Sequence, residues 1–181
     1  MKRKVQLVLL CEDQQQEAFL RRFLQGTGWS NRMFRVVMGR PGAGGHAFVT
    51  SRFPIELQAY RTRRVDCALV VMIDGDNLGL VGRNATLDRA CDNVRVPRRR
   101  GDDRVVVAVP TWNIETWLAY LDGETIDEGR DDYRRLPTPG QCGPLVKNLI
   151  AMRKKGALRG PSPASLEAAC VEYRTRLLQR T

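Results

Sequence analysis

The stretch LVVMIDGDNLGL, residues 69–80, is apolar for five positions and then reaches Asp74, Gly75 and Asp76. An apolar run of this length, bounded by turn-forming residues, predicts a buried strand. Burying a carboxylate is costly unless a partner compensates its charge. A buried strand that ends in two carboxylates therefore raises the question of which cation offsets them.

Strands and helices alternate along the chain. Apolar runs predict strands at residues 5–10, 33–40, 65–73 and 104–110. Helical spacing of apolar residues predicts helices at 14–28, 51–64, 82–94, 113–121, 143–155 and from about 164 onward. This order predicts an α/β fold, a Rossmannoid sandwich around a mostly parallel four-stranded sheet. We expect a core at 1–121 and a loop with a helical C-terminal extension at 122–181, packed on the same domain.

The charge balance is strongly basic. Thirty Lys and Arg residues oppose twenty Asp and Glu residues, which gives a formal net charge of +10 in 181 residues. A basic protein attracts polyanions, of which nucleic acid is the commonest. Basic runs flank the strongest strand, and we expect their loops to lie near its acidic end and to bind backbone phosphates. The candidates for nucleic-acid binding are Arg98, Arg99, Arg100, Lys154 and Lys155.

Cysteine usage and the N-terminal segment bear on the compartment. The five cysteines are widely spaced, odd in number and form no CxxC pair, which argues against a zinc site or a disulfide framework. The first apolar run ends in Glu12 and Asp13, which favours a buried strand over a signal peptide. No segment approaches transmembrane length. We expect a cytoplasmic protein without a membrane partner.

Acidic residues follow three of the predicted strands. Glu12 closes the first strand, Asp74 and Asp76 close the third, and Glu115 follows the fourth. Residues i and i+2 of an extended segment point the same way, and Gly75 leaves the backbone free between the two aspartates. Carboxyl ends of parallel strands share one edge, so we expect the carboxylates to meet there. They would hold Mg²⁺ or Mn²⁺, as one ion or as two about 4 Å apart. The alternative is that the DGD segment is only a turn.

One further motif has a competing interpretation. The glycine-rich segment at 39–46 invites a phosphate-binding interpretation, but it lacks the G-K-[ST] ending of a P-loop. This absence favours a flexible loop. His46, the only histidine, is expected to be exposed on that loop.

Three segments together resemble the Toprim fold of topoisomerases, primases and OLD-family nucleases. They are LVLLCEDQQQEAFLRRFL at 7–24, VVMIDGDN at 70–77 and VPTWNIETWLAYL at 109–121. The first is similar to the family's strand-end glutamate pattern, the second to its DxD strand, and the third to the last acidic element of the OLD-type branch. The resemblance spans roughly residues 5–121.

The resemblance implies roles for individual residues. Glu12 would be a metal ligand and a general base or acid, and Asp74 and Asp76 would hold Mg²⁺. Glu115, with Asn113 beside it, would complete a second metal site. OLD-type enzymes also place a late lysine on the scissile phosphate.

Several positions match the family only loosely. Lys147 is the candidate for the late lysine by its order in the chain, with Lys154 and Lys155 as rivals. Asp13 stands where the family usually has glycine, and it could serve as a substitute ligand. Gln16 stands where the family has a second glutamate.

The function that the resemblance implies is a Mg²⁺- or Mn²⁺-dependent endonuclease or nickase, with DNA as the favoured substrate. Small stand-alone proteins of this kind work beside an ATPase in phage defence, so a partner ATPase is expected, and a homodimer is compatible with the sequence. One alternative is an inactive subunit that binds nucleic acid or an ATPase, with Gln16 marking a decayed site. A second alternative is an RNA-processing Toprim endoribonuclease.

Overall fold

The structure, a computed structural model, describes residues 6–40, 42 and 44–178. Its sheet has four parallel strands in the order β2-β1-β3-β4. The strands are β1 (Gln6–Cys11), β2 (Phe34–Met38), β3 (Cys67–Met72) and β4 (Val105–Ala108). These features confirm the α/β class and the four-stranded parallel sheet predicted from the sequence. Val5, Pro41 and Ala43, which belong to a predicted strand and a predicted loop, lie outside the described residues.

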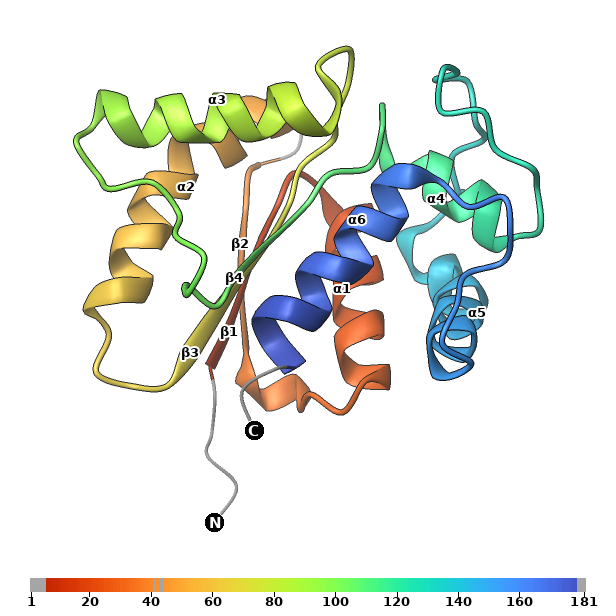
Figure 1. Cartoon of the computed structure of the whole chain (residues 1–181), viewed down its shortest axis with the longest axis horizontal. Helices are drawn as coiled ribbons and strands as arrows, with labels where there is room; N and C mark the ends of the chain where they lie inside the picture. Colours follow the sequence, from red (N-terminus) through yellow and green to blue (C-terminus); the bar gives the residue numbers. More distant parts are fainter. Residues whose placement is uncertain (1–5, 41, 43, 179–181) are drawn as a thin grey trace.

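Helices cover both faces of the sheet (Figure 1). They are α1 (Gln14–Gly26), α2 (Gly45–Thr62), α3 (Gly79–Asn93), α4 (Ile114–Leu121), α5 (Gly143–Lys154) and α6 (Ala164–Tyr173). Short helical segments are η1 (Asn31–Met33), η2 (Pro139–Cys142) and the π-helical η3 (Arg174–Leu178). α2 and α3 lie on one face of the sheet, and α1 and α6 lie on the other, with α4 and α5 beyond them. Within the described residues, no helix is both long and apolar enough to cross a bilayer.

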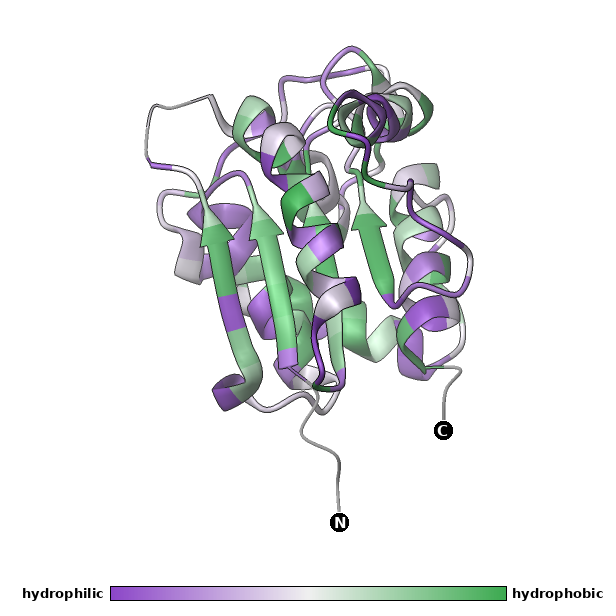
Figure 2. Ribbon diagram, turned by 90° about the vertical axis from the view of Figure 1, so that its left-hand side faces the viewer, coloured by the Kyte–Doolittle hydropathy of each residue, from purple (hydrophilic) through white to green (hydrophobic). Residues whose placement is uncertain are grey.

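The strands are apolar along their whole length because they contact helices on both faces. Figure 2 shows the central strands as hydrophobic ribbons between helices with mixed surfaces. Successive side chains of a strand point to opposite faces. Leu7 and Leu9 of β1 therefore pack with α1 and its neighbours, whereas Val8 and Leu10 pack with α2 and α3. This burial on both sides is typical of parallel sheets.

The residues after position 121 complete one layer of the sandwich. α5 packs on α1 and α4, and α6 packs directly on the edge strand β4. The indole of Trp117 in α4 donates a 2.8 Å hydrogen bond to the hydroxyl of Ser165 in α6. The core on this face of the sheet therefore depends on the C-terminal helices.

The largest difference between a predicted and an observed boundary is at the start of α2. The helix predicted at 51–64 begins earlier, at Gly45, so Pro54 lies inside α2 and not in its first turn. Val49 and Phe53 are buried one turn apart on the sheet-facing side of this helix. Their burial extends the helix back into the glycine-rich segment, where local propensity alone favours a loop.

Candidate active site at the carboxyl edge of the sheet

Glu12 and Asp74 meet at the carboxyl edge of the sheet. Glu12 follows β1 directly and Asp74 follows β3, and these two strands are parallel neighbours. The backbone N–H of Asp74 donates a 2.7 Å hydrogen bond to Oε1 of Glu12. Parallel pairing therefore brings together two carboxylates that are 62 residues apart in the chain.

Gln16, in the first turn of α1, links the two acidic residues. Its side chain is fully buried. Its Oε1 accepts a 3.0 Å hydrogen bond from the backbone N–H of Glu12, and its Nε2 donates a 2.8 Å bond to Oδ1 of Asp74. The start of α1 is itself capped by Asp13, whose Oδ1 accepts from the backbone N–H of Gln16 at 3.0 Å. Helix capping therefore positions the amide that orients Asp74.

Both carboxyl groups have raised pKa values. Burial, opposed by the hydrogen bond from Asp74 and reinforced by the negative charge of Asp76, raises the pKa of Glu12 to about 7. Burial and the negative charge of Glu12 also raise the pKa of Asp74, although the hydrogen bond from Gln16 opposes the rise. The charge of Glu12 thus opposes ionisation of Asp74, and the charge of Asp76 opposes ionisation of Glu12, which is the electrostatic situation that a bound cation relieves.

Asp76 has partners of its own. Its φ of 46° places it in the left-handed region, so the segment is not extended and the alternation of an extended strand does not set the direction of Asp76 relative to Asp74. The carboxylate of Asp76 forms a 2.6 Å ion pair with the buried Arg83 of α3, and His46 Nδ1 lies 3.9 Å from it. Arg83 also donates a 2.8 Å hydrogen bond to the backbone carbonyl of Asp74. The arginine thus holds both ends of the DGD segment.

The left-handed conformation of Asp76 results from the close approach of the loops that follow β3 and β4. Asp76 N donates to the carbonyl of Trp112 at 2.8 Å, and Gly75 N donates to the carbonyl of Pro110 at 2.8 Å. Trp112 is also left-handed, with a φ of 60°. The loops after β3 and β4 therefore pair outside the sheet. Gly75 is needed there because the loops pack closely, and not because its backbone conformation is open only to glycine.

Glu115 approaches the cluster from the first turn of α4. It is buried, and burial raises its pKa, while Arg135 opposes the rise. Arg135, from the long segment between α4 and α5, lies 3.0 Å from Asp13 Oδ2 and 3.7 Å from Glu115 Oε1. Asn113, the N-cap residue of α4, donates to the carbonyl of Asp131 at 3.5 Å. Glu115 thus faces an arginine of this chain.

An open cleft of about 590 Å³ lies beside the pair. Glu12 and the first turn of α1 form one wall, the glycine-rich segment between β2 and α2 forms another, and residues 135–139 close a third side. Gly45 packs so closely on Glu12 that a Cβ atom there would lie 2.7 Å from its Oε2. Glu12 lines the cleft and Asp74 does not, so Glu12 is the carboxylate of the pair that a ligand in the cleft can reach.

The donor set at this edge fits one hard divalent cation. Mg²⁺ is commonly held by one or two carboxylates with water and substrate phosphate filling its other positions, and Glu12 and Asp74 supply two. Their raised pKa values agree with a site built for a positive charge. In the described part of the chain, no group of three or more His, Cys, Asp or Glu side chains is arranged to bind a metal. Asp76 is paired with Arg83, and Glu115 lies 3.7 Å from Arg135, so each of these carboxylates already faces a cation of this chain.

The predicted lysines lie away from the cleft. Lys147 is exposed on α5, and Lys154 and Lys155 are exposed at the C-terminal end of the same helix. Among the described residues, the cleft is lined by arginines and by no lysine. Order along the chain was therefore a poor guide to the position of Lys147.

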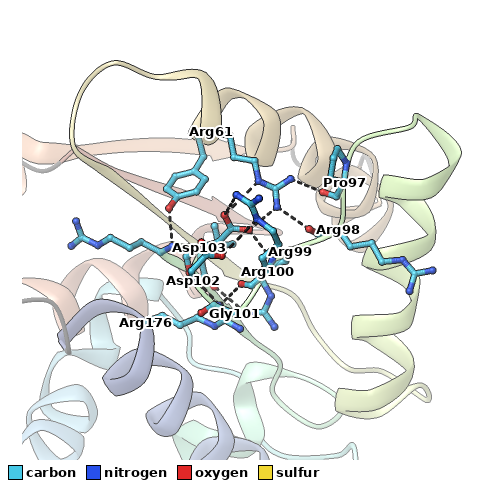
Figure 3. Close-up of polar contacts among 12 residues, drawn as sticks. Arg61, Pro97, Arg98, Arg99, Arg100, Gly101, Asp102, Asp103 and Arg176 are labelled. Atoms are coloured by element: carbon cyan, nitrogen blue, oxygen red, sulfur yellow. Dashed lines mark hydrogen bonds and ion pairs between the residues drawn. The ribbon is translucent and has the colours of Figure 1, made fainter.

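The basic loop at 95–104 lies at the opposite edge of the sheet, which corrects the expectation that it adjoins the acidic residues. It leads into the start of β4, whereas Glu12 and Asp74 follow the ends of parallel strands. Figure 3 shows the polar contacts of this loop, with Asp103 at their centre. Arg61 forms a 2.6 Å ion pair with Asp103 and donates to the carbonyls of Pro97 and Arg98 at 2.6 and 2.8 Å.

The arginines of this loop form ion pairs with acidic residues of the protein itself. Arg98 pairs with Asp92 at 2.5 Å, and Arg99 pairs with Glu172 of α6. Arg100 is the most exposed of the three and lies 3.8 Å from Asp103. Arg99 thus ties the loop to the C-terminal helices.

Sequence reasoning missed several residues at the cleft and the pair. Arg83 supports the DGD segment, Arg40 and Arg135 line the cleft, and Gln15 is buried in its wall. The one available signal was proximity in the sequence, since Arg83 lies in the helix that follows the DGD segment. No local pattern indicates the position of Arg135, because a long irregular segment carries it there.

Comparison of the chain with protein-family models, curated proteins and solved structures gave no match. The assignment of a function therefore depends on the geometry of the Glu12–Asp74 pair and its cleft.

Proposed function

We propose that this protein is a metal-dependent nuclease that cleaves phosphodiester bonds of nucleic acid, with DNA as the favoured substrate. The observation that carries the proposal is the hydrogen-bonded Glu12–Asp74 pair, two carboxyl groups with raised pKa values beside an open cleft. The net charge of +10 supports a polyanionic substrate.

Glu12 and Asp74 would hold one Mg²⁺ or Mn²⁺ ion. When bound, such an ion polarises a phosphate oxygen and lowers the pKa of a coordinated water. Gln16 keeps Asp74 in place through its 2.8 Å hydrogen bond, and the backbone of Asp74 does the same for Glu12. Arg83 forms an ion pair with Asp76 and offsets part of the negative charge on Glu12.

Plasmid nicking tests this proposal. Purified protein is incubated with supercoiled plasmid and Mn²⁺ or Mg²⁺, with EDTA as a blank and a structured RNA as the alternative substrate. We expect Asp74→Asn and Glu12→Gln to lower the rate by a factor on the order of 100 or more, because each removes one of two ligands. The control is Asp132→Asn, which changes an exposed aspartate outside the cleft. Equal nicking by wild type and Asp74→Asn would remove the metal-site assignment.

A second candidate is a non-catalytic subunit that binds nucleic acid or a partner. Two contacts favour it. Arg83 already neutralises Asp76, and an amide rather than a carboxylate contacts Asp74 at position 16. Calorimetric titration with Mn²⁺ separates the candidates, because a decayed site takes up no ion. Preferential cleavage of the structured RNA would instead support the RNA-processing alternative.

A partner ATPase and a role in phage defence stay predictions of the Toprim resemblance. Copurification of the chain from its native cells tests them, because a stable ATPase partner would appear at a fixed ratio to it.

A further inference from the structure

The walls of the 590 Å³ cleft supply hydrogen-bond donors as well as the Glu12 carboxylate. A volume of this size is within the range of sites that bind small molecules. Arg40 lines the cleft from the glycine-rich segment, and Arg135 lines it from the segment that precedes η2. Two arginines in one cleft are suited to an oxyanion, because the guanidinium group donates several hydrogen bonds in one plane.

The two arginines differ in whether an acidic residue of the protein already pairs with them. Arg135 is paired with Asp13 at 3.0 Å, although its side chain is 68% exposed. Arg40 is exposed, and among the described residues it makes no ion pair or side-chain hydrogen bond. Arg40 is thus the cation that remains available to a ligand.

The starts of two long helices also lie on this cleft. The first turn of α1 and the residues that begin α2 line it. Asp13 caps α1, but Gly44, the N-cap residue of α2, has a φ of 65° and provides no side-chain acceptor. The first N–H groups of α2 are therefore left for water or an anion.

A buried amide in the wall provides independent support for a ligand. Gln15 is 2% exposed and lines the cleft, and its Nε2 has no hydrogen-bond partner within the described structure. Buried donors in native proteins nearly always have an acceptor. A ligand that brings an acceptor oxygen into the cleft would satisfy this one.

We propose that the cleft is an oxyanion subsite in which Arg40, Gln15 and the start of α2 bind a phosphate group of a nucleic-acid strand next to Glu12. This inference rests on the proposed function for the identity of the strand and deepens it by naming the residues that bind a phosphate. The negative charge of Asp13 does not oppose binding fully, because Arg135 is paired with it. Gly45, the first residue of α2, packs on Glu12, so the start of α2 lies beside the carboxylate.

Oligonucleotide binding without metal tests the subsite separately from the chemistry. A fluorescein-labelled single strand is titrated with protein in EDTA, and its anisotropy is followed at several salt concentrations. We expect Arg40→Gln to weaken binding about tenfold and to reduce the salt slope by about 1, because one phosphate contact is lost. Gln15→Met, of similar length but without the donor, is expected to weaken binding about fivefold.

The matched control is Arg64→Gln, which removes the same charge from an exposed residue just before β3, at the opposite edge. We expect its affinity to stay within about twofold of wild type, since distant charges are screened. Circular dichroism melts show whether Gln15→Met is folded. If it is not, the comparison of Arg40→Gln with wild type alone decides the test. Equal affinities for wild type and Arg40→Gln, or equal losses in Arg40→Gln and Arg64→Gln, would overturn the subsite.

Competitors identify the source of the phosphate. Inorganic phosphate should compete at millimolar concentration with wild type but not with Arg40→Gln. A mononucleotide that binds more tightly than the strand would overturn the assignment to nucleic acid. If binding behaves as expected while no metal-dependent nicking is found, the nuclease proposal fails and the subsite stands. If nicking depends on Asp74 but Arg40→Gln binds the strand as tightly as wild type, the subsite fails and the nuclease proposal stands.

Discussion

The side-chain amide of Gln16 donates a 2.8 Å hydrogen bond to Oδ1 of Asp74, 58 residues further along the chain. The same amide accepts from the backbone of Glu12 at 3.0 Å. A neutral, fully buried group thus bridges the backbone of Glu12 and the carboxylate of Asp74 at the candidate metal site. An acidic residue here would have no donor for Asp74 and would add a third negative charge.

Replacing this amide by a carboxylate should couple stability to metal. We expect Gln16→Glu to lower the free energy of unfolding in EDTA by about 2–4 kcal/mol, because a buried carboxylate is added beside two others. Mn²⁺ should restore the loss and bind more tightly than to wild type. Urea denaturation with and without Mn²⁺ measures both effects. Gln58→Glu, the same substitution at an exposed position of α2 outside the cleft, should change neither. A loss that Mn²⁺ does not reverse would contradict a cation site here.

The raised pKa of Glu12 predicts how stability depends on pH. A carboxyl group with a pKa of about 7 in the folded protein, against an ordinary 4.5, binds more protons folded than unfolded between these values. In EDTA, its contribution to stability should be complete below about pH 4.5 and lost as the pH rises through 7. Glu12→Gln should abolish this part of the decline and be the more stable protein above pH 7, by on the order of 2 kcal/mol.

Urea denaturation of wild type and Glu12→Gln from pH 4 to 8 measures this difference. Glu124→Gln is the control, because Glu124 is exposed and should leave the profile of wild type unchanged. Parallel pH profiles for wild type and Glu12→Gln would show that Glu12 ionises normally.

Gly75 is required by close packing. A Cβ atom at this position would lie 2.8 Å from the carbonyl oxygen of Pro110 and 3.3 Å from Cα of Gly79. We expect Gly75→Ala to destabilise the protein by about 1–3 kcal/mol, since backbone atoms cannot move aside as a side chain can. Thermal denaturation measures the loss. Gly101→Ala places its Cβ atom in open space and serves as the control. A stable Gly75→Ala protein would mean that the two loops separate easily.

The basic loop should respond unequally to loss of its arginines. Arg61→Ala leaves Asp103, which is 4% exposed, without its main partner and removes two further hydrogen bonds. We expect a loss of about 2–4 kcal/mol. Arg98→Ala breaks only an exposed ion pair with Asp92, which should cost less than about 1 kcal/mol. Guanidinium denaturation of both variants checks the difference, and equal losses would contradict a structural role for Arg61.

The pattern of residues predicted the class of fold and the meeting of Glu12 with Asp74. Strands that are apolar on both faces favour a parallel sheet between two layers of helices, and the carboxyl ends of neighbouring parallel strands share an edge. Both inferences need only local burial and the direction of the strands. Tertiary structure decided the direction of Asp76, since the pairing of two loops placed its backbone in the left-handed region.

The three-dimensional fold also decided which cations lie near the acids. Arg135 reaches Asp13 from an irregular segment 122 residues away, and the run at Arg98–Arg100 lies at the far edge of the sheet. Charge runs carry no information on which end of a strand their loops adjoin, because that depends on topology. The sequence thus determined where carboxylates gather, whereas contacts between distant segments decided which of them remain available for a ligand.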